Sequence, residues 1–198
     1  MLLGVAVVAV GGPRMAYAAA VPGPVTRVCL RGAESTGKTT LARTLAAEYD
    51  TVWNPEFGRP YTEIGRDPDA PWTSDEFTHI ARIQCWYEDT LAHSARDVLF
   101  CDTDAFTTAL FHQVYLSEPT HAFDELLERH YDLYFVCGIE VPWKHDGVRE
   151  FEEQRHWMHR RYLERAQQSG VPWVLLEGPP AARLQESSSA VDQLLAGR

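Results

Sequence analysis

The sequence predicts an α/β fold in which helices cover a parallel sheet, and three observations support this prediction. Strand-like and helix-like stretches alternate along most of the chain, as they do in parallel sheets with helical crossovers. The first strand-like run leads into a glycine-rich loop and then a helical pattern. The 198 residues are 45% hydrophobic and 11% aromatic, a composition that suits one domain with a substantial core.

A phosphate-binding loop (P-loop) is the most specific motif of the chain. Residues 32–39 read GAESTGKT and fit the pattern G-x-x-x-x-G-K-[ST]. The preceding run, 25–31, is apolar and rich in β-branched residues like a buried strand, and 40–49 has the apolar spacing of a helix. In this context the loop can wrap the phosphates of a nucleotide. The weaker alternative is an ordinary glycine-rich turn before a helix.

The loop residues have expected roles in binding a nucleotide triphosphate. Lys38 is expected to reach the β- and γ-phosphates, and the Thr39 hydroxyl is expected to hold Mg²⁺. ATP and Mg²⁺ are therefore the expected cofactors. The expected nucleotide-binding residues of the loop are Gly32, Ala33, Glu34, Ser35, Thr36, Gly37, Lys38, Thr39 and Thr40.

Four further strands and five helical stretches are expected after this first unit. Short apolar runs predict strands at 51–53, 97–101, 131–137 and 171–176. Helical patterns are expected at about 74–95, 105–116, 120–130, 150–169 and 181–195. The first of these helices has Ser74 as its expected N-cap, and the polar loop 142–149 is the expected lid. The predicted fold is that of a P-loop NTPase: a five-stranded parallel sheet flanked by helices, laid out like a nucleoside or nucleotide kinase with a lid.

Carboxylates at the ends of two predicted strands are candidate catalytic groups, because ligands of open α/β sheets bind beyond the carboxyl ends of the strands. Asp102 is expected to serve Mg²⁺. Asp104 is expected to face Mg²⁺ or the acceptor, with N-capping of the next helix as its alternative. Glu56 is expected to accept the proton of the acceptor hydroxyl. Arg59 would pair with Glu56 or reach a phosphate, and a solvated ion pair of the two is the alternative.

Arginine and tryptophan side chains supply the remaining candidates. Arg149 in the expected lid, and Arg155 shortly after it, are expected to offset the charge of the transferring phosphoryl group. Trp53 and Trp143 either stack on a flat acceptor ring or pack in the core, and the sequence supports both roles equally. The candidate catalytic set is Lys38, Glu56, Asp102, Asp104 and Arg149.

The charge and the cysteine pattern exclude several other classes of protein. The net charge is −10 and no basic run is present, which argues against binding to a nucleic-acid backbone. The four cysteines form no C-x-x-C pair, and three of them lie in strand-like runs as small core residues. The partners are therefore expected to be a small-molecule acceptor and ATP, while the oligomeric state stays open.

Residues 1–24 are expected to be a disordered or mis-started extension before a kinase domain at 25–198. The apolar run 1–10 has no positive charge before it and is too short for a membrane span, so a signal peptide is the weaker alternative. Translation from Met15 is a further alternative. An enzyme that uses ATP is expected in the cytoplasm.

Taken together, these motifs resemble the ribosylnicotinamide kinase (nicotinamide riboside kinase) domain of NadR-type NAD-biosynthesis proteins, which are P-loop kinases of the AAA-type ATPase-like class. The resemblance spans roughly 26–177. Its motifs run in the family's order: GAESTGKTTLA at 32–42, EFGRPY at 56–61, FCDTD at 100–104, YDLY at 131–134, P-W…D-G…R at 142–149 and WMH at 157–159. The first motif is common to many NTPases, whereas the EFGR, DTD and P-W…D-G…R set is far more specific.

The resemblance implies ATP-dependent phosphorylation of the 5′-hydroxyl of nicotinamide riboside, giving nicotinamide mononucleotide and ADP. It implies that Glu56, Asp102 and Asp104 handle substrate hydroxyls and Mg²⁺, and that Arg149 and Arg155 belong to the lid. It also implies that one of Trp53, Phe57 or Trp143 stacks on the nicotinamide ring. The larger family members carry an adenylyltransferase domain with an H-x-G-H motif. This chain has no such motif, so a free-standing kinase is expected.

Two alternative functions stay open at this point. One is a kinase of the same fold that acts on another nucleoside or on a nucleotide. A monophosphate acceptor needs extra basic groups, and Arg59 and Arg66 are the only obvious ones near the second strand. The other is a P-loop ATPase switch without a small-molecule acceptor.

Overall fold

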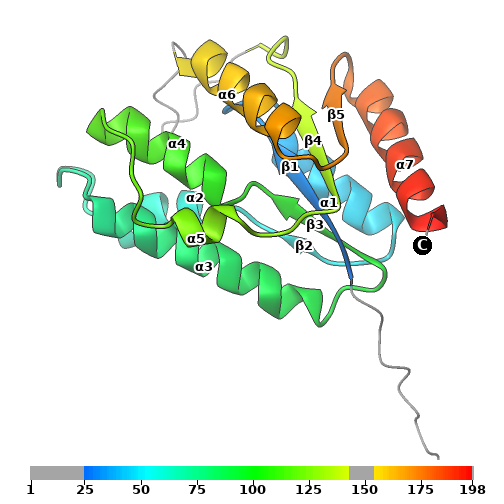
Figure 1. Cartoon of the computed structure of the whole chain (residues 1–198), viewed down its shortest axis with the longest axis horizontal. Helices are drawn as coiled ribbons and strands as arrows, with labels where there is room; N and C mark the ends of the chain where they lie inside the picture. Colours follow the sequence, from blue (N-terminus) through cyan, green and yellow to red (C-terminus); the bar gives the residue numbers. More distant parts are fainter. Residues whose placement is uncertain (1–24, 143–153, 198) are drawn as a thin grey trace, which may run out of the picture.

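The computed structural model of the chain describes residues 25–142 and 154–197 (Figure 1). The expected extension at 1–24 lies outside these residues, as do Trp143 and Arg149 of the expected lid. The strands are β1 (Thr26–Arg31), β2 (Trp53–Asn54), β3 (Val98–Asp102), β4 (Leu133–Cys137) and β5 (Trp173–Leu176). The α-helices are α1 (Lys38–Glu48), α2 (Gly58–Pro60), α3 (Ser74–Ala92), α4 (Ala105–Leu116), α5 (Asp124–Leu127), α6 (Arg155–Gln168) and α7 (Pro180–Ala196), and a π-helical turn spans Tyr61–Gly65.

The strands form one parallel five-stranded sheet in the order β2-β3-β1-β4-β5. β1 lies in the centre, where Val28 is in register with Phe100 of β3 on one side and Leu133 of β4 on the other. The expected five-stranded parallel sheet is thus confirmed. Because β1 has a neighbour on each side, the loop that follows it opens at the centre of the carboxyl edge of the sheet, where open α/β folds bind ligands.

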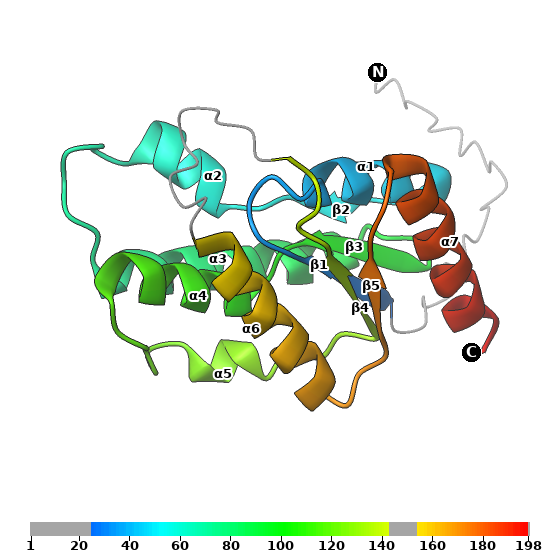
Figure 2. The ribbon, with the colours of Figure 1, turned by 90° about the horizontal axis from the view of Figure 1, so that it is seen from above.

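Helices cover both faces of the sheet (Figure 2). One face packs against α1 and α7 through a cluster that includes Leu30, Leu45, Phe100 and Val191. On the other face, α4 and α6 contribute to a cluster around Val136, and α3 packs against the sheet close to Leu99 and Cys101. Successive side chains of each strand therefore point to two faces that are both covered by helices, which explains why the strand segments are apolar almost throughout.

Several local predictions differ from the structure. Ser74 is not the N-cap of α3: Thr73 is, because its hydroxyl accepts from the Glu76 N–H while the Glu76 carboxylate accepts from the Thr73 N–H in a capping box. The helix expected at 120–130 is only the four-residue α5. The helical turns at 58–65 were not predicted, since Gly58 and Pro60 in that stretch are typical of loops.

The four cysteines are buried and carry free thiols. Burial raises the pKa of every one of these thiols, which keeps them protonated and unreactive. The core role predicted for the strand cysteines is confirmed. Within the described ranges, no helix has both the length and the apolar character needed to cross a bilayer.

A buried ion pair joins the end of β1 to the start of α4. The Arg31 guanidinium donates from Nε (2.9 Å) and Nη2 (2.6 Å) to one carboxylate oxygen of Asp104, and both side chains are almost wholly buried. The other oxygen of Asp104 caps α4 by accepting from the Thr107 N–H. Arg31 also lies over the Tyr134 ring at 3.7 Å. This pair anchors the strand that leads directly into the P-loop.

We expect Asp104→Ala to lower the free energy of unfolding by about 3–5 kcal/mol, because removing one partner leaves the other charge buried and unpaired. Urea unfolding followed by circular dichroism measures the change. The matched control is Glu164→Ala, which removes the exposed Glu164–Arg161 pair and is expected to change stability by about 1 kcal/mol or less. Equal losses in the two variants would contradict the role assigned to the buried pair.

Candidate active site

The P-loop is closed by contacts among its own atoms. Gly37 has φ 85°, a left-handed conformation that suits glycine, and it leads into α1. The Thr36 hydroxyl donates to the Ala33 carbonyl at 2.7 Å, and Lys38 Nζ donates to the same carbonyl at 3.0 Å. A Cβ on Gly32 would lie 2.8 Å from Thr36 Oγ1 and 3.0 Å from the Cys137 Cβ, so close packing requires glycine there. The loop is thus compact, with its lysine folded back along it.

Asp102 ends β3 directly beside the loop. One of its carboxylate oxygens accepts a hydrogen bond from the Thr39 hydroxyl at 2.5 Å, and the other is buried and has no hydrogen-bond partner among the described residues. Burial, and next the nearby Glu56 carboxylate, raise the pKa of Asp102 to about 6. A hydroxyl and a carboxylate at this position suit Mg²⁺, which takes few protein ligands and completes its shell with phosphates and water.

The side chains alone do not enclose a metal ion. Among the residues that the structure describes, no group of three or more His, Cys, Asp or Glu side chains could hold one. Any Mg²⁺ beside Thr39 and Asp102 therefore depends on oxygens from a bound nucleotide, as is usual for phosphate-linked Mg²⁺ sites.

The two aspartates of the DTD motif point to different partners. Thr103 between them has φ 74°, a strained conformation for a β-branched residue. This turn breaks the strand alternation, so Asp102 contacts Thr39 while Asp104 contacts Arg31. Both oxygens of Asp104 are engaged, and it does not line the cleft described below. Asp104 is therefore the N-cap of α4, which was the alternative role given for it. Its carboxylate faces Arg31 and the helix start, not the cleft.

A cleft of about 160 Å³ extends from the P-loop to an aromatic compartment between α3 and α4. At the phosphate end it is lined by Glu34, Ser35, Thr36, Gly37, Lys38, Thr39 and Thr40. The aromatic compartment is lined by Thr62, Trp72, Phe77, Ile80, Gln84, Thr108, Phe111 and Tyr115, and Thr103 and Thr107 line the cleft beside Asp102 and Asp104. Between these groups lie Glu56, Gly58 and Arg59.

Helical spacing explains the aromatic compartment. Phe77, Ile80 and Gln84 share one face of α3, and Phe111 and Tyr115 are one turn apart on α4, which packs against it. Trp72 precedes α3, and its ring lies 4.8 Å from the Phe77 ring and 4.9 Å from the Tyr115 ring between centroids. The compartment is therefore an aromatic pocket that can receive a flat ring.

The expected acceptor residues divide into two groups. Glu56 and Arg59 line the cleft, and the Phe57 N–H is held by Gln84 Oε1 at 2.8 Å, which fixes the segment that carries them. Trp53 does not line the cleft. It packs against the core under α1 and α7, which was the alternative for this residue. Phe57 also lies outside the lining and packs against Tyr61, His79 and Tyr87.

Arg155, an expected lid arginine, is buried at the start of α6. Its Nη2 donates to the Val141 carbonyl at 2.9 Å and the Ile139 carbonyl at 3.4 Å. In the structure it holds the segment that follows β4, and it does not line the cleft. No described contact tests the other two lid residues, Arg149 and Trp143.

The sequence analysis missed the aromatic wall of the cleft, above all Trp72 and Tyr115. Tyr115 lay in a predicted helix but carried no motif. For Trp72 a signal existed: a tryptophan directly before a helix cap, in the stretch PWTSDE, stands close to the ligand edge of the fold. The spacing of Phe77 and Gln84 resembled ordinary core packing.

The sequence matches a known domain family and curated relatives of known name. The sequence model described as "AAA domain" matches residues 27–183. The "Trifunctional NAD biosynthesis/regulator protein NadR" of Escherichia coli (strain K12) is 31% identical over 159 residues, which are 77% of this chain and 38% of that protein. The chain thus spans well under half the length of this curated relative.

Solved structures share the fold. The structure described as "Crystal structure of NadR protein in complex with NR" superposes with a TM-score of 0.71 at 25% sequence identity, covering 87% of this chain and 52% of that chain. A thymidylate kinase from Ehrlichia chaffeensis gives a TM-score of 0.57 at 13% identity, over 86% of this chain and 100% of the other. The second likeness concerns the fold alone.

Proposed function

This chain belongs to the AAA domain family, and from that premise we propose that it is an ATP-dependent kinase that phosphorylates the 5′-hydroxyl of nicotinamide riboside to give nicotinamide mononucleotide. The similarity to NadR, of which a structure is described in complex with NR, supports this acceptor. The proposed kinase domain spans 25–198, and its need for ATP favours the cytoplasm as its place of action.

One observation carries the proposal: a single cleft joins a P-loop to an aromatic pocket, with a carboxylate between them. Phosphoryl transfer requires the γ-phosphate and an acceptor hydroxyl to meet in line, and such a cleft holds both reactants. The nicotinamide ring of the riboside is flat and cationic. Trp72 and Tyr115 suit such a ring, because aromatic faces attract cations.

The residues in and around the cleft would have separate roles in phosphoryl transfer. The loop N–H groups and Lys38 would bind the β- and γ-phosphates. Glu56 would accept the proton of the 5′-hydroxyl as the oxygen attacks phosphorus, and Arg59 would neutralise charge beside it. Thr39 and Asp102 would hold Mg²⁺, which neutralises charge on the phosphates. In the proposal Arg149 and Arg155 remain lid arginines, Arg155 acting by holding the segment after β4.

The direct test is the release of ADP from ATP and Mg²⁺ by purified protein, with and without nicotinamide riboside, beside a panel of nucleosides and nucleoside monophosphates. Strong stimulation by nicotinamide riboside, with nicotinamide mononucleotide as the product, is expected. If only a different acceptor stimulates ADP release, the proposed substrate is wrong but the proposed kinase activity stands. ADP release that ignores every acceptor would overturn the kinase proposal in favour of an ATPase switch.

Trp72→Ala is expected to raise the KM for nicotinamide riboside about tenfold or more, because stacking of a base-like ring on an aromatic side chain contributes about 1–3 kcal/mol. The Kd for ATP should stay within about twofold, since Trp72 lies at the far end of the cleft from the P-loop. Trp86→Ala is the matched control, because Trp86 is 58% exposed on α3 and outside the cleft. A KM unchanged by the Trp72 substitution would remove this residue from the acceptor site.

A further inference from the structure

Arg183 is a buried arginine of α7 that reaches the P-loop from outside the cleft. Only 5% of the residue is exposed. Its Nη1 donates to the Thr36 carbonyl at 2.7 Å, a contact between residues 147 positions apart in the sequence. Neither the sequence motifs nor the proposed chemistry gives this residue a role. A buried guanidinium that donates hydrogen bonds to backbone carbonyls fixes the conformation of the segments that carry these carbonyls.

The Thr36 contact determines which way one loop amide faces. The peptide between Thr36 and Gly37 is trans, so the Thr36 carbonyl and the Gly37 N–H point in opposite directions. With the carbonyl held toward Arg183, the Gly37 N–H faces away from α7. Gly37 lines the cleft, and phosphate binding by such loops depends on N–H groups that face the anion.

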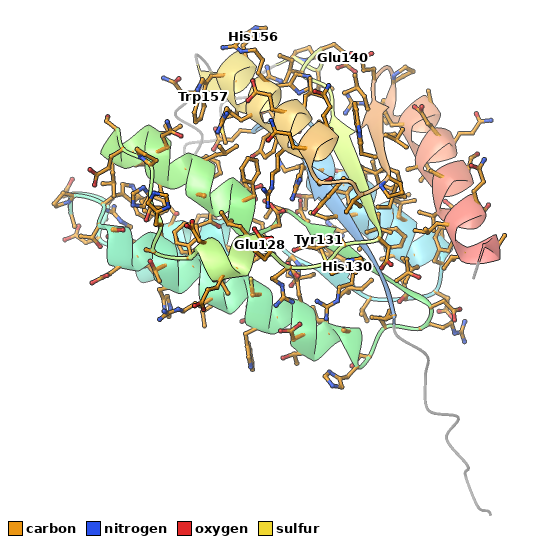
Figure 3. All side chains as sticks on the ribbon, viewed as in Figure 1. Glu128, His130, Tyr131, Glu140, His156 and Trp157 are labelled. Atoms are coloured by element: carbon orange, nitrogen blue, oxygen red, sulfur yellow. The ribbon has the colours of Figure 1, made fainter. Side chains whose placement is uncertain are left out.

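The same guanidinium also ties down the two loops that flank the P-loop. Nε donates to the Gly178 carbonyl after β5 at 3.0 Å, and Nη2 donates to the Gly138 carbonyl after β4 at 3.3 Å. Nη2 also contacts the Glu140 carboxylate at 2.5 Å, and the same carboxylate oxygen accepts from the Gly178 N–H at 2.7 Å. Figure 3 shows Glu140 beyond the carboxyl end of β4, whereas His130 and Tyr131 lie at the other end of this strand.

We propose that Arg183 is a positioning residue for the nucleotide: it orients the Thr36–Gly37 peptide so that the Gly37 N–H faces the β-phosphate, and it holds the loops after β4 and β5 against the P-loop. The inference rests on the proposed function in one respect, namely that the P-loop binds ATP. It predicts a specific loss of affinity for nucleotides with a β-phosphate, and it leaves the acceptor pocket unchanged.

Calorimetric titration of ADP with Mg²⁺, and separately of nicotinamide riboside, tests the role in the full chain. Arg183→Met is expected to raise the Kd for ADP about tenfold or more, because charge-assisted hydrogen bonds are lost, while the Kd for the riboside stays within about twofold. Arg183→Lys keeps the charge but not the planar guanidinium, so we expect a smaller rise in the Kd for ADP than in Arg183→Met. The lysine variant also tests the role if the methionine variant fails to fold.

Two further variants act as matched controls. Arg161→Met removes an arginine from the exposed face of α6 and is expected to change neither Kd. Glu140→Gln keeps an oxygen acceptor for Arg183 and should alter the Kd for ADP by no more than about threefold. These controls distinguish the effect of losing the Arg183 contact with the P-loop from the effect of losing any arginine.

The outcomes are distinguishable. If wild-type protein does not bind ADP, the proposed function itself fails. If wild-type protein binds ADP and the Arg183 variants bind it equally well, the positioning role is wrong. If the Arg183 variants lose ADP and riboside affinity in the same proportion, the residue only supports folding, which also overturns the inference.

Discussion

Replacing Lys38 by Ala is expected to lower the turnover number about a thousandfold or more and to weaken ATP binding. In the proposed mechanism, the ammonium group is the charge that the loop brings to the β- and γ-phosphates, where negative charge shifts during transfer. Lys38 is the only lysine within the described ranges, so no neighbouring ammonium there can replace it. Its present bond to the Ala33 carbonyl, at 3.0 Å, is one that bound phosphate can take over.

The measurement is ADP formation at saturating riboside, together with ATP titration by calorimetry. Arg43→Ala provides a matched control, since it removes a positive charge from the exposed side of the same helix, α1. The control should retain wild-type turnover. Turnover in Lys38→Ala within about tenfold of wild type would show that the P-loop is not the site of phosphoryl transfer.

The substitution Glu56→Gln has the second-largest expected effect. It should lower kcat by about 10²–10⁴-fold, which is the usual contribution of a general base, and leave the Kd for ATP within about twofold. The amide has nearly the same shape as the carboxylate, so the cleft keeps its form. The substitution removes the ability to accept the hydroxyl proton, together with the negative charge of the carboxylate.

Steady-state kinetics and ATP titration together give the required separation of kcat from binding. Glu128→Gln is the control, because Glu128 is exposed and lies far from Glu140 and the carboxyl edge of the sheet (Figure 3). A kcat that is unchanged in Glu56→Gln would eliminate Glu56 as the base. A parallel loss in kcat and ATP affinity would assign it to nucleotide binding instead.

The parts of the site that lie close together in the sequence were predictable from the sequence. The P-loop is a contiguous motif, and its geometry follows from local rules for glycine and helix starts. The contact of Asp102 with Thr39 follows from the position of Asp102 at the end of an apolar strand next to β1. Such predictions need only the order and direction of the strands.

Residues whose roles depend on side-chain direction were harder to place. Asp104 and Asp102 share a motif, yet the left-handed turn at Thr103 sends them to different partners, and no residue-type pattern reports that φ angle. Trp53 stands beside the ligand edge but packs inward, because its side chain joins the core cluster that α1 and α7 form on one face of the sheet. The first case was decided by the local backbone turn and the second by packing against the core.

The aromatic pocket proposed to bind the acceptor could not be predicted from the sequence, because three separate segments build it. Trp72 comes from a loop, Phe77 from α3 and Tyr115 from α4, and each residue taken alone looks like ordinary core packing. Only the packing of α3 against α4 turns them into a wall of one cavity.

The position of β1 also has a consequence for the order in which the parts of the protein fold. β1 leaves the ribosome before the other four strands of its sheet, but its register partners in β3 and β4 and the Arg183 contact to Thr36 come from chain synthesised later. Closing such long loops is slow compared with forming local helices. We therefore expect the P-loop, although it follows the first strand of the sheet, to reach its final shape only when α7 docks and Arg183 contacts Thr36.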